Sequence, residues 1–184
     1  GPMCVVKDFV EGIAETDVKA ACMLYRAILG YTPAPEMAYK LFKHLQTYIL
    51  RMRKQTLNAI FIAEWLAEHK KVSKVYYPTL LTGEEARLYR RQMSGPSAMI
   101  AFELKDCTKE AAFRFLKALN VILRAVSLGF VRSLAEHANT MTHSDIPPED
   151  QLKMGITPGL IRLSIGLEEP EDIIEDLKRA LAEV

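Results

Sequence analysis

Residues 35–69 carry an uninterrupted helical pattern, and its length limits the folds open to this chain. Neither glycine nor proline occurs from residue 36 to residue 69, and apolar residues recur there at the spacing of one helix face. One continuous helix of this length would measure roughly 50 Å at 1.5 Å per residue, more than one small core can cover. We therefore expect one end to meet another domain or a partner chain. The alternative is a kinked pair of shorter helices.

After residue 69 the sequence indicates short strands that alternate with helices. Strand-like apolar runs occur at 72–77, 98–104, 121–128 and 160–167. Helical spacing occurs at 83–93, 108–119, 131–138 and 171–183. Thr108 has the position and chemistry of an N-cap, and the proline- and glycine-containing stretch 139–159 predicts loops. One long helix followed by about four strands and their helices predicts an α+β or α/β sandwich.

The residues before this region predict an N-terminal arm. Residues 3–6 form a short apolar run that fits a strand, and 8–29 have helical character with Gly30 as a C-terminal stop. Pro33 and Pro35 then break the chain. We interpret residues 1–2, Gly-Pro before a methionine, as the scar of tag removal and leave them out of the fold.

The overall composition excludes several classes of protein. Hydrophobic residues make up 49% and charged residues 26%, and the formal net charge is +1. This composition predicts a globular protein with no electrostatic affinity for nucleic acid or an anionic membrane. No apolar run has the roughly 20 residues of a membrane span. The three cysteines are odd in number and far apart, so we expect buried thiols in a reducing cytoplasm rather than disulfides or a metal site.

Short catalytic motifs are missing from the sequence. It contains no GxGxxG, no Walker loop and no GxSxG. His137 and His143 are six residues apart without nearby cysteines, which is a poor metal site, and exposed or structural histidines are the interpretation we favour.

Two features remain that could bind a ligand. Arg162 stands in a predicted strand on the face opposite Ile161 and Leu163, beside small polar neighbours. Such an arginine can hold a carboxylate in a bidentate fork, although from the spacing alone we favour a solvent-facing arginine. The stretch AVSLG, residues 125–129, ends an apolar run with serine and glycine, where backbone amides can approach a ligand. Taken on its own, this stretch is better explained as a plain strand-to-turn transition.

Several longer stretches occur together in a recognisable order. The C-terminal ones are AVSLG (125–129), SLAEHANTMTHS (133–144), GI (155–156), LIRLSIGLEE (160–169) and DIIEDLKRAL (172–181). The upstream ones are LGYTPAPEMA (29–38), LRMRKQTLNA (50–59), VYYPTL (75–80) and SGPSAMIAFEL (94–104). In combination they resemble the Cys/Met-metabolism family of pyridoxal-phosphate (PLP) enzymes, which includes cystathionine γ-synthase, methionine γ-lyase and O-acylhomoserine sulfhydrylases. The resemblance covers most of the chain.

This resemblance implies the small C-terminal domain of fold-type I PLP enzymes, a mostly antiparallel four-stranded sheet with helices packed on it and a long helix before it. Residues 3–34 would be an arm that ends the cofactor domain, and 35–184 the C-terminal α/β domain. By the same resemblance, four positions of this chain would contact or adjoin the substrate. Arg162 matches the arginine that binds the substrate α-carboxylate, Ser127 and Leu128 match the loop beside the cofactor-linked lysine, and Thr142 lies near the pocket.

The resemblance also implies that essential parts lie elsewhere. The family's Schiff-base lysine sits just before the matched region, and none of the thirteen lysines here takes a matching position. We therefore expect no catalytic or cofactor-binding residue in this chain and no PLP bound to it alone. The expected partners are an N-terminal cofactor-binding domain or subunit and further copies of the chain, with no nucleic acid or membrane.

Two functions remain open at this point. The chain is the substrate-carboxylate-binding domain of a PLP-dependent C–S lyase or transferase of sulfur amino-acid metabolism, active only with a lysine-bearing half. Alternatively it is a non-catalytic module that serves interaction or oligomerisation. Departures from the family pattern motivate the second hypothesis: Phe130 replaces a glycine, Arg132 replaces a glutamate, and Ser97-Ala98 replace a Gly-Gly pair.

Overall fold

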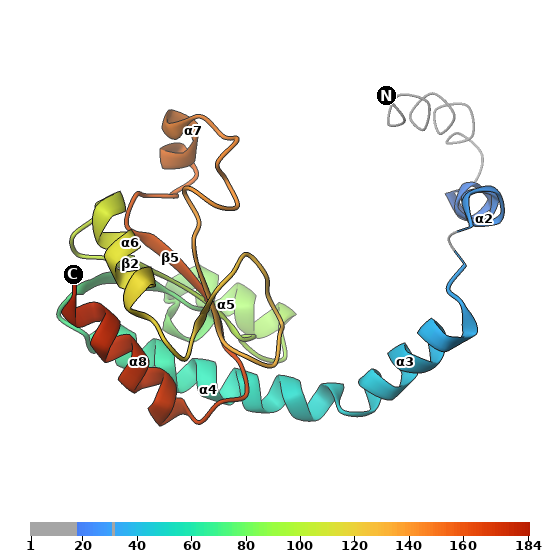
Figure 1. Cartoon of the computed structure of the whole chain (residues 1–184), viewed down its shortest axis with the longest axis horizontal. Coiled ribbons are helices and arrows are strands. Elements are labelled where there is room, and N and C mark those ends of the chain that lie inside the picture. The colour runs from blue at the N-terminus through green and yellow to red at the C-terminus, as the bar shows by residue number, and fades with distance from the viewer. Residues whose placement is uncertain (1–17, 31) are drawn as a thin grey trace. The chain divides into compact units, whose positions relative to one another are not determined.

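The computed structural model of the chain describes residues 18–30 and 32–184 (Figure 1). The chain divides into two compact units, of which the first reaches to Thr47 and the second comprises Tyr48–Val184. The strand predicted at 3–6 and the first part of the helix predicted at 8–29 lie outside the described residues. The domain boundary predicted after residue 34 stays a prediction.

The described part of the first unit contains helices α2 and α3. Helix α2 spans Val18–Leu29 and stops before Gly30, whose φ of 72° fits the predicted helix stop. Helix α3 spans Pro35–Gln46 and buries none of its residues. Its apolar side chains at Met37, Leu41 and Leu45 are each more than half exposed. The apolar face of α3 is therefore uncovered within the described part of the chain.

The long helical pattern is divided at Thr47. Helix α4 spans Tyr48–Glu68, and Thr47 between α3 and α4 has φ −103° and ψ 1°. Its hydroxyl donates to the carbonyl of His44 at 3.4 Å. The chain thus forms the pair of shorter helices that the sequence left open as the alternative.

The second unit is built on one five-stranded sheet in the order β1-β2-β5-β4-β3. The strands are β1 (Val72–Tyr76), β2 (Met99–Leu104), β3 (Leu123–Arg124), β4 (Leu134–His137) and β5 (Leu160–Ser164). All neighbouring strands are antiparallel except β3 and β4, which are parallel. The α/β class and the mostly antiparallel sheet are confirmed, but the sheet has five strands where four were predicted.

Strand β4 replaces the short helix predicted at 131–138, which was wrong. Leucine, alanine and glutamate favour helices, but all four residues of Leu134–His137 are buried in a strand paired with β5 and β3. Helix α6 packs on one face of β4, and Thr142 contacts Glu136 on the other. A strand covered on both faces shows no alternation in its sequence. The strand predicted at 121–128 is correspondingly reduced to β3, a two-residue partner at the edge of the sheet.

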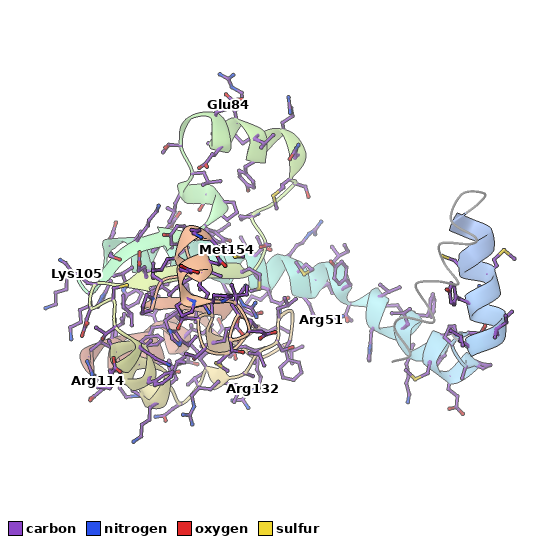
Figure 2. The ribbon with its side chains drawn as sticks, turned by 90° about the horizontal axis from the view of Figure 1, so that it is seen from above. Arg51, Glu84, Lys105, Arg114, Arg132 and Met154 are labelled. Atoms are coloured by element: carbon purple, nitrogen blue, oxygen red, sulfur yellow. The ribbon has the colours of Figure 1, made fainter. Side chains whose placement is uncertain are left out.

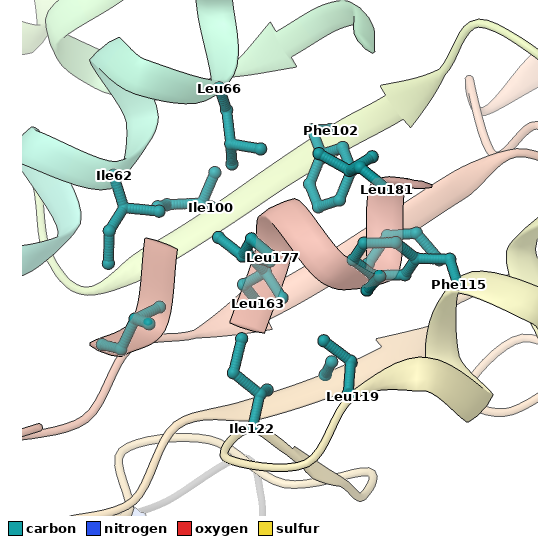
Figure 3. Close-up of a cluster of buried hydrophobic side chains, with 14 of the residues drawn as sticks. Ile62, Leu66, Ile100, Phe102, Phe115, Leu119, Ile122, Leu163, Leu177 and Leu181 are labelled. Carbon is teal, nitrogen blue, oxygen red and sulfur yellow. The ribbon is translucent and has the colours of Figure 1, made fainter. Parts of the chain in front are cut away.

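Helices cover one face of this sheet, and the core lies between them (Figure 3). Helices α4, α6 (Lys109–Ala118) and α8 (Pro170–Ala182) pack together on that face. Thr108 caps α6 as predicted, accepting a hydrogen bond from the Ala111 N–H at 3.2 Å. The core residues drawn include Ile62, Leu66, Ile100, Phe102, Phe115, Leu119, Ile122, Leu163, Leu177 and Leu181, each buried.

The remaining helices stand away from this core. Helix α7 (Pro148–Lys153) lies within the predicted loop region on the far side of the sheet from α4 and α8 (Figure 1). Helix α5 (Gly83–Gln92), marked by Glu84, projects from the rest of the second unit (Figure 2) and follows a short 3-10 turn at Pro78–Leu80.

A buried carboxylate fixes the turn that follows α6. Asp176 on α8 is 1% exposed. It accepts hydrogen bonds from the backbone N–H groups of Asn120 at 2.9 Å, Val121 at 3.0 Å and Ile122 at 2.9 Å. Arg179 donates to the same carboxylate. The approach to β3 is therefore anchored to α8 through one side chain.

A second network fixes the exit of β5. The Glu168 carboxylate accepts from the Ser133 N–H at 2.7 Å and from the Ser133 hydroxyl at 2.9 Å. The Ser133 hydroxyl oxygen in turn accepts from the Gly166 N–H at 2.8 Å. Asn58 on α4 donates to the carbonyls of Gly166 and Glu168 at 3.2 and 2.7 Å. The end of β5, the start of β4 and α4 are thus joined by hydrogen bonds.

The cysteines differ from expectation. Cys22 and Cys107 are free and exposed, so buried thiols were the wrong prediction for these two, and Cys4 lies outside the described residues. Cys107 is exposed because it lies in the loop between β2 and α6, 3.4 Å from Glu103 Oε1. In residues 18–30 and 32–184, no helix has the length and apolarity needed to cross a membrane.

Candidate functional site

Arg162 lies in the middle of β5, on the sheet face away from the core. It pairs with Ala101 of β2 on one side and with Glu136 of β4 on the other. Its neighbours Ile161 and Leu163 are fully buried among the core residues. The Arg162 side chain is 26% exposed, so solvent can still reach part of the guanidinium.

Glu136 binds Arg162 from the next strand. Its Oε1 lies 3.0 Å from Arg162 Nε, and the glutamate side chain is only 1% exposed. Thr142 also donates its hydroxyl hydrogen to Glu136 Oε1, at 3.0 Å. The other oxygen, Oε2, is buried and has no hydrogen-bond partner in the described part of the chain. A buried carboxylate oxygen without a hydrogen-bond partner lowers the stability of the fold, so Glu136 is an unusual residue for the interior of a sheet.

Sequence reasoning missed Glu136 because the segment was interpreted as a helix. With β4 and β5 paired in antiparallel register, Glu136 and Arg162 stand directly opposite each other, and opposite charges at such positions attract. The signal was therefore present, but it could be recognised only after the strand pairing was known.

The loop between β3 and β4 closes the other side of Arg162. Arg162 Nη2 donates to the carbonyl oxygen of Ser127 at 3.4 Å. The Gly129 N–H donates to the Ser164 hydroxyl at 3.0 Å. Gly129 has a φ of 70°, a conformation that favours glycine. Leu128 belongs to the same loop and is 61% exposed. The structure thus joins Arg162 to Ser127 directly and to Thr142 through Glu136.

The same loop is held from its other side by helix α4. Gln55, 2% exposed, donates from its side-chain Nε2 to the carbonyl of Phe130 at 2.7 Å. Val126, Leu128 and Phe130 each leave at least half of their surface exposed. The loop therefore has a fixed backbone and presents apolar side chains beside the arginine.

This arrangement leaves donors for an anionic ligand. A guanidinium has five N–H groups, and Glu136 and Ser127 engage one on Nε and one on Nη2. The end formed by Nη1 and Nη2 retains enough N–H groups for a bidentate contact with a carboxylate. Glu136 fixes the orientation of the planar group from its buried edge, so that a ligand would meet it already positioned.

The two histidines of the following loop have structural surroundings. His137 is fully buried, with Nε2 2.8 Å from the Pro158 carbonyl and Nδ1 2.8 Å from the Thr140 hydroxyl. Burial lowers the pKa of His137, the bond to Pro158 raises it, and Lys109 lowers it further. His143 Nδ1 lies 3.0 Å from the Thr142 hydroxyl. Among the described residues, no three His, Cys, Asp or Glu side chains gather as metal ligands.

The lysines between residues 40 and 178 do not form a buried site. A Schiff-base lysine needs an amine that meets the cofactor in a protected pocket. Every lysine side chain between residues 40 and 178 is exposed or half-buried. Several of these lysines bind partners at the surface, such as Lys54 with Glu169 and Lys153 with Asp150. None of the lysines between residues 40 and 178 is fully buried in this structure.

Comparison with known protein families and sequences gives a consistent set of relatives. A family model described as "Cys/Met metabolism PLP-dependent enzyme" matches residues 6–182. The chain is 43% identical over 152 residues to L-methionine gamma-lyase of Pseudomonas putida, covering 83% of this chain and 38% of that protein. It is 37% identical over 177 residues to cystathionine gamma-lyase of Mus musculus, covering 95% and 44%.

Solved structures agree with the sequence relatives. A cystathionine gamma-lyase from Micromonospora echinospora matches with a TM-score of 0.83 and 35% identity, covering 91% of this chain and 43% of that one. A cystathionine gamma-lyase from Lactobacillus plantarum, complexed with L-serine, matches with a TM-score of 0.77 and 37% identity, covering 85% and 40%. The chain spans less than half the length of each of these relatives.

Proposed function

Because the chain belongs to the Cys/Met metabolism PLP-dependent enzyme family, we propose that it is the substrate-carboxylate-binding part of a lyase or transferase. This enzyme would act on the C–S bonds of sulfur amino acids, with Arg162 as the residue that binds the α-carboxylate. The observation that carries the proposal is the guanidinium of Arg162, oriented by Glu136 and Ser127 and still able to donate from its outer end.

The surroundings of Arg162 support this role. The loop backbone beside it is fixed by Gln55 and Ser164, whereas its apolar side chains remain exposed. A bound amino acid could place its carboxylate on Arg162 and its side chain against this loop. Ser127, Leu128 and Thr142 then act as neighbours that shape the site, with Thr142 working through its bond to Glu136.

Catalysis requires a second part that carries the cofactor. Two observations support this: no lysine between residues 40 and 178 is fully buried, and the relatives extend well beyond the region that this chain matches. We assign the Schiff-base lysine and the PLP site to that remaining part, which also makes it the expected partner. The exposed apolar faces of α3 and α4 are suited to contacts with it or with further copies of the chain.

A second candidate is a non-catalytic module with the same fold. One observation favours it: Arg162 already has a buried ion-pair partner, so that the fold does not need a ligand to neutralise it. In that case Arg162 has a structural role and substrate carboxylates do not compete for it.

Co-expression with the missing part separates the two candidates. The probe is the portion of Pseudomonas putida L-methionine gamma-lyase that this chain does not match. The complex is purified and assayed for the absorbance of bound cofactor and for thiol release from L-methionine. Arg162→Lys retains the charge but loses the fork, so we expect KM to rise by about tenfold or more with a smaller change in kcat.

Arg87→Lys is the matched control, because Arg87 is an exposed arginine of α5 that pairs only across one helix turn with Glu84. It should leave both kinetic constants unchanged. A complex that binds the cofactor but shows no turnover would favour the non-catalytic module. Turnover that is unchanged by Arg162→Lys would overturn the role of Arg162 as the residue that binds the α-carboxylate.

A further inference from the structure

The segment between β4 and β5 carries Thr142, the residue that contacts Glu136. From residue 138 to residue 145 this segment runs in turns, and α7 follows on the far side of the sheet from α4 and α8 (Figure 1). Backbone carbonyls in such turns have no strand or helix ladder to bind them, so they need hydrogen-bond donors from elsewhere. The groups that donate to them therefore decide where Thr142 is held.

One buried side chain, that of Gln151 in α7, binds three of these carbonyls. Gln151 is 4% exposed. Its Nε2 donates to the carbonyl oxygens of His143 at 2.7 Å and Ile146 at 2.9 Å, and to that of Asn139 at 3.3 Å. Its Oε1 accepts from the side-chain amide of Asn139. An amide nitrogen has two N–H groups, so one side chain joins three points of the segment and uses its full donor capacity.

The backbone of Gln151 is held as firmly as its side chain. Its N–H donates to the Pro147 carbonyl at 3.0 Å, and its own carbonyl accepts from the Ile156 N–H at 2.8 Å. Gln151 is therefore fixed within α7 and joined to the stretch that leads into β5. A donor fixed in this way determines the positions of the carbonyls that it binds.

Gln151 acts directly beside Thr142. The carbonyl of His143, the next residue in the chain, accepts the shortest of the three bonds. Thr142 donates to Glu136 Oε1 at 3.0 Å, and Arg162 Nε lies 3.0 Å from the same oxygen. Glu136 Oε2 has no partner in residues 18–30 and 32–184. Among these residues, Thr142 and Arg162 are thus the two that orient the Glu136 carboxylate.

We propose that Gln151 is a positioning residue of the carboxylate-binding site. It holds Thr142 in place, Thr142 orients Glu136, and Glu136 orients the guanidinium of Arg162 toward its ligand. Gln151 itself does not touch the ligand. This inference rests on the proposed function and extends the site to α7. A role confined to the stability of the loop is the competing outcome.

Hydrogen exchange at the Arg162 Nε–H tests the proposal on the full chain without any need for turnover. Gln151→Met keeps an unbranched side chain of similar length but removes the donor, and Thr142→Val removes the hydroxyl. Each should raise the exchange rate about fivefold, the effect of losing about one hydrogen bond, because Glu136 then protects this hydrogen less well. The double variant should exchange no faster than Thr142→Val alone.

Kinetics of the complex with the unmatched portion of Pseudomonas putida L-methionine gamma-lyase gives a second measurement. We expect Gln151→Met to raise the KM for L-methionine about fivefold and to leave kcat within about twofold, because orientation of the carboxylate contact is what weakens. In the Thr142→Val background it should raise KM no further. Gln92→Met is the matched control, since Gln92 is an exposed glutamine at the end of α5, and it should change neither measurement.

An internal reference separates positioning from a general loss of stability. Arg179 Nε donates to the Ala118 carbonyl at 3.3 Å, on the sheet face opposite the Arg162 site. Exchange that rises equally at Arg179 and Arg162 would overturn the positioning role. If Gln151→Met does not fold, Gln151→Glu takes its place, because it keeps the shape and the acceptor for Asn139. Failure of both variants to fold would also make Gln151 a structural residue and overturn the proposal.

The two measurements also distinguish this proposal from the proposed function. Faster exchange at Arg162 alone, in a chain whose complex shows no turnover, supports the positioning role and counts against the proposed function. Turnover that depends on Arg162, with exchange or KM unchanged by Gln151→Met, overturns the positioning role alone.

Discussion

Glu136 and Arg162 form an ion pair in which the two side chains are unequally buried. The Oε1 atom of Glu136 lies 3.0 Å from Arg162 Nε, and the Glu136 side chain is 1% exposed whereas that of Arg162 is 26% exposed. Water can therefore replace Glu136 around Arg162, but it cannot readily replace Arg162 around Glu136. The pair should respond differently to the loss of each partner, because an uncompensated buried charge is the expensive case.

Arg162→Ala is expected to lower the free energy of unfolding by about 2–3 kcal/mol, because it leaves Glu136 charged and buried. Glu136→Gln should cost about 1 kcal/mol or less, since the amide still accepts from Thr142. The double variant should be more stable than Arg162→Ala alone. Urea unfolding of the three variants checks this cycle. Strictly additive losses would mean that the two residues are energetically independent.

Asp176→Ala is expected to lower the free energy of unfolding by about 3 kcal/mol, because three backbone N–H groups lose a charged acceptor. Asp176→Asn keeps one acceptor oxygen and should have an intermediate effect. Glu175→Ala is the control, since that neighbouring carboxylate is 76% exposed, and it should stay within about 0.5 kcal/mol. Chemical denaturation measures all three variants, and equal losses for Asp176→Ala and Glu175→Ala would contradict the anchoring role.

Gly166→Ala is expected to destabilise the chain by about 1–3 kcal/mol, the usual cost of overpacking. A Cβ atom at this position would lie 2.5 Å from the Ser133 nitrogen and 2.6 Å from the Arg132 carbonyl carbon. Gly95→Ala is the matched control, because its added Cβ would meet no atom within 4 Å. Thermal unfolding monitored by circular dichroism compares them, and a melting temperature unchanged by Gly166→Ala would disprove the close packing.

Stability is expected to fall as the pH drops below about 6.5, the ordinary pKa of histidine. Burial lowers the pKa of His137 in the folded chain, and burial and two lysines lower that of His69. Below that pH the unfolded chain binds protons that the folded chain resists, so protonation favours unfolding. Above it both states are neutral and this effect vanishes. The Tm is measured at about pH 7.5 and about pH 5.5 for the original chain and for His137→Gln. We expect the Tm of His137→Gln to fall less than that of the original chain. Equal falls in Tm would count against His137 as a source of the pH dependence.

The elements with clear periodicity could be predicted from sequence, and the ones defined by their neighbours could not. The run from Met99 to Leu104 alternates between half-buried and fully buried residues, so its pattern revealed a strand directly. Leu134–His137 is buried at every position, so its sequence shows no alternation that would indicate a strand. The residue types alone favoured a helix. The cover of β4 on the face away from the core includes Thr142, from the loop that follows it, which no local pattern encodes.

The site was predictable to the same limited extent. Strand alternation placed Arg162 opposite Ile161 and Leu163, and the motif order suggested its possible ligand. Its partner Glu136 is 26 positions away in the sequence and becomes relevant only through the register of β4 with β5. Whether Arg162, Ser127, Leu128 and Thr142 contact a substrate stays a prediction for the experiments above.

The position of β5 has a consequence for the synthesis of this domain. It is the last strand in the chain, yet it lies in the middle of the sheet and supplies the hydrogen-bonding partner of both β2 and β4. While the ribosome has made only β1 to β4, those two strands have unpaired inner edges, which invite association with other chains. We therefore expect a chain that stops before Leu160 to leave the inner edges of β2 and β4 unpaired and to aggregate.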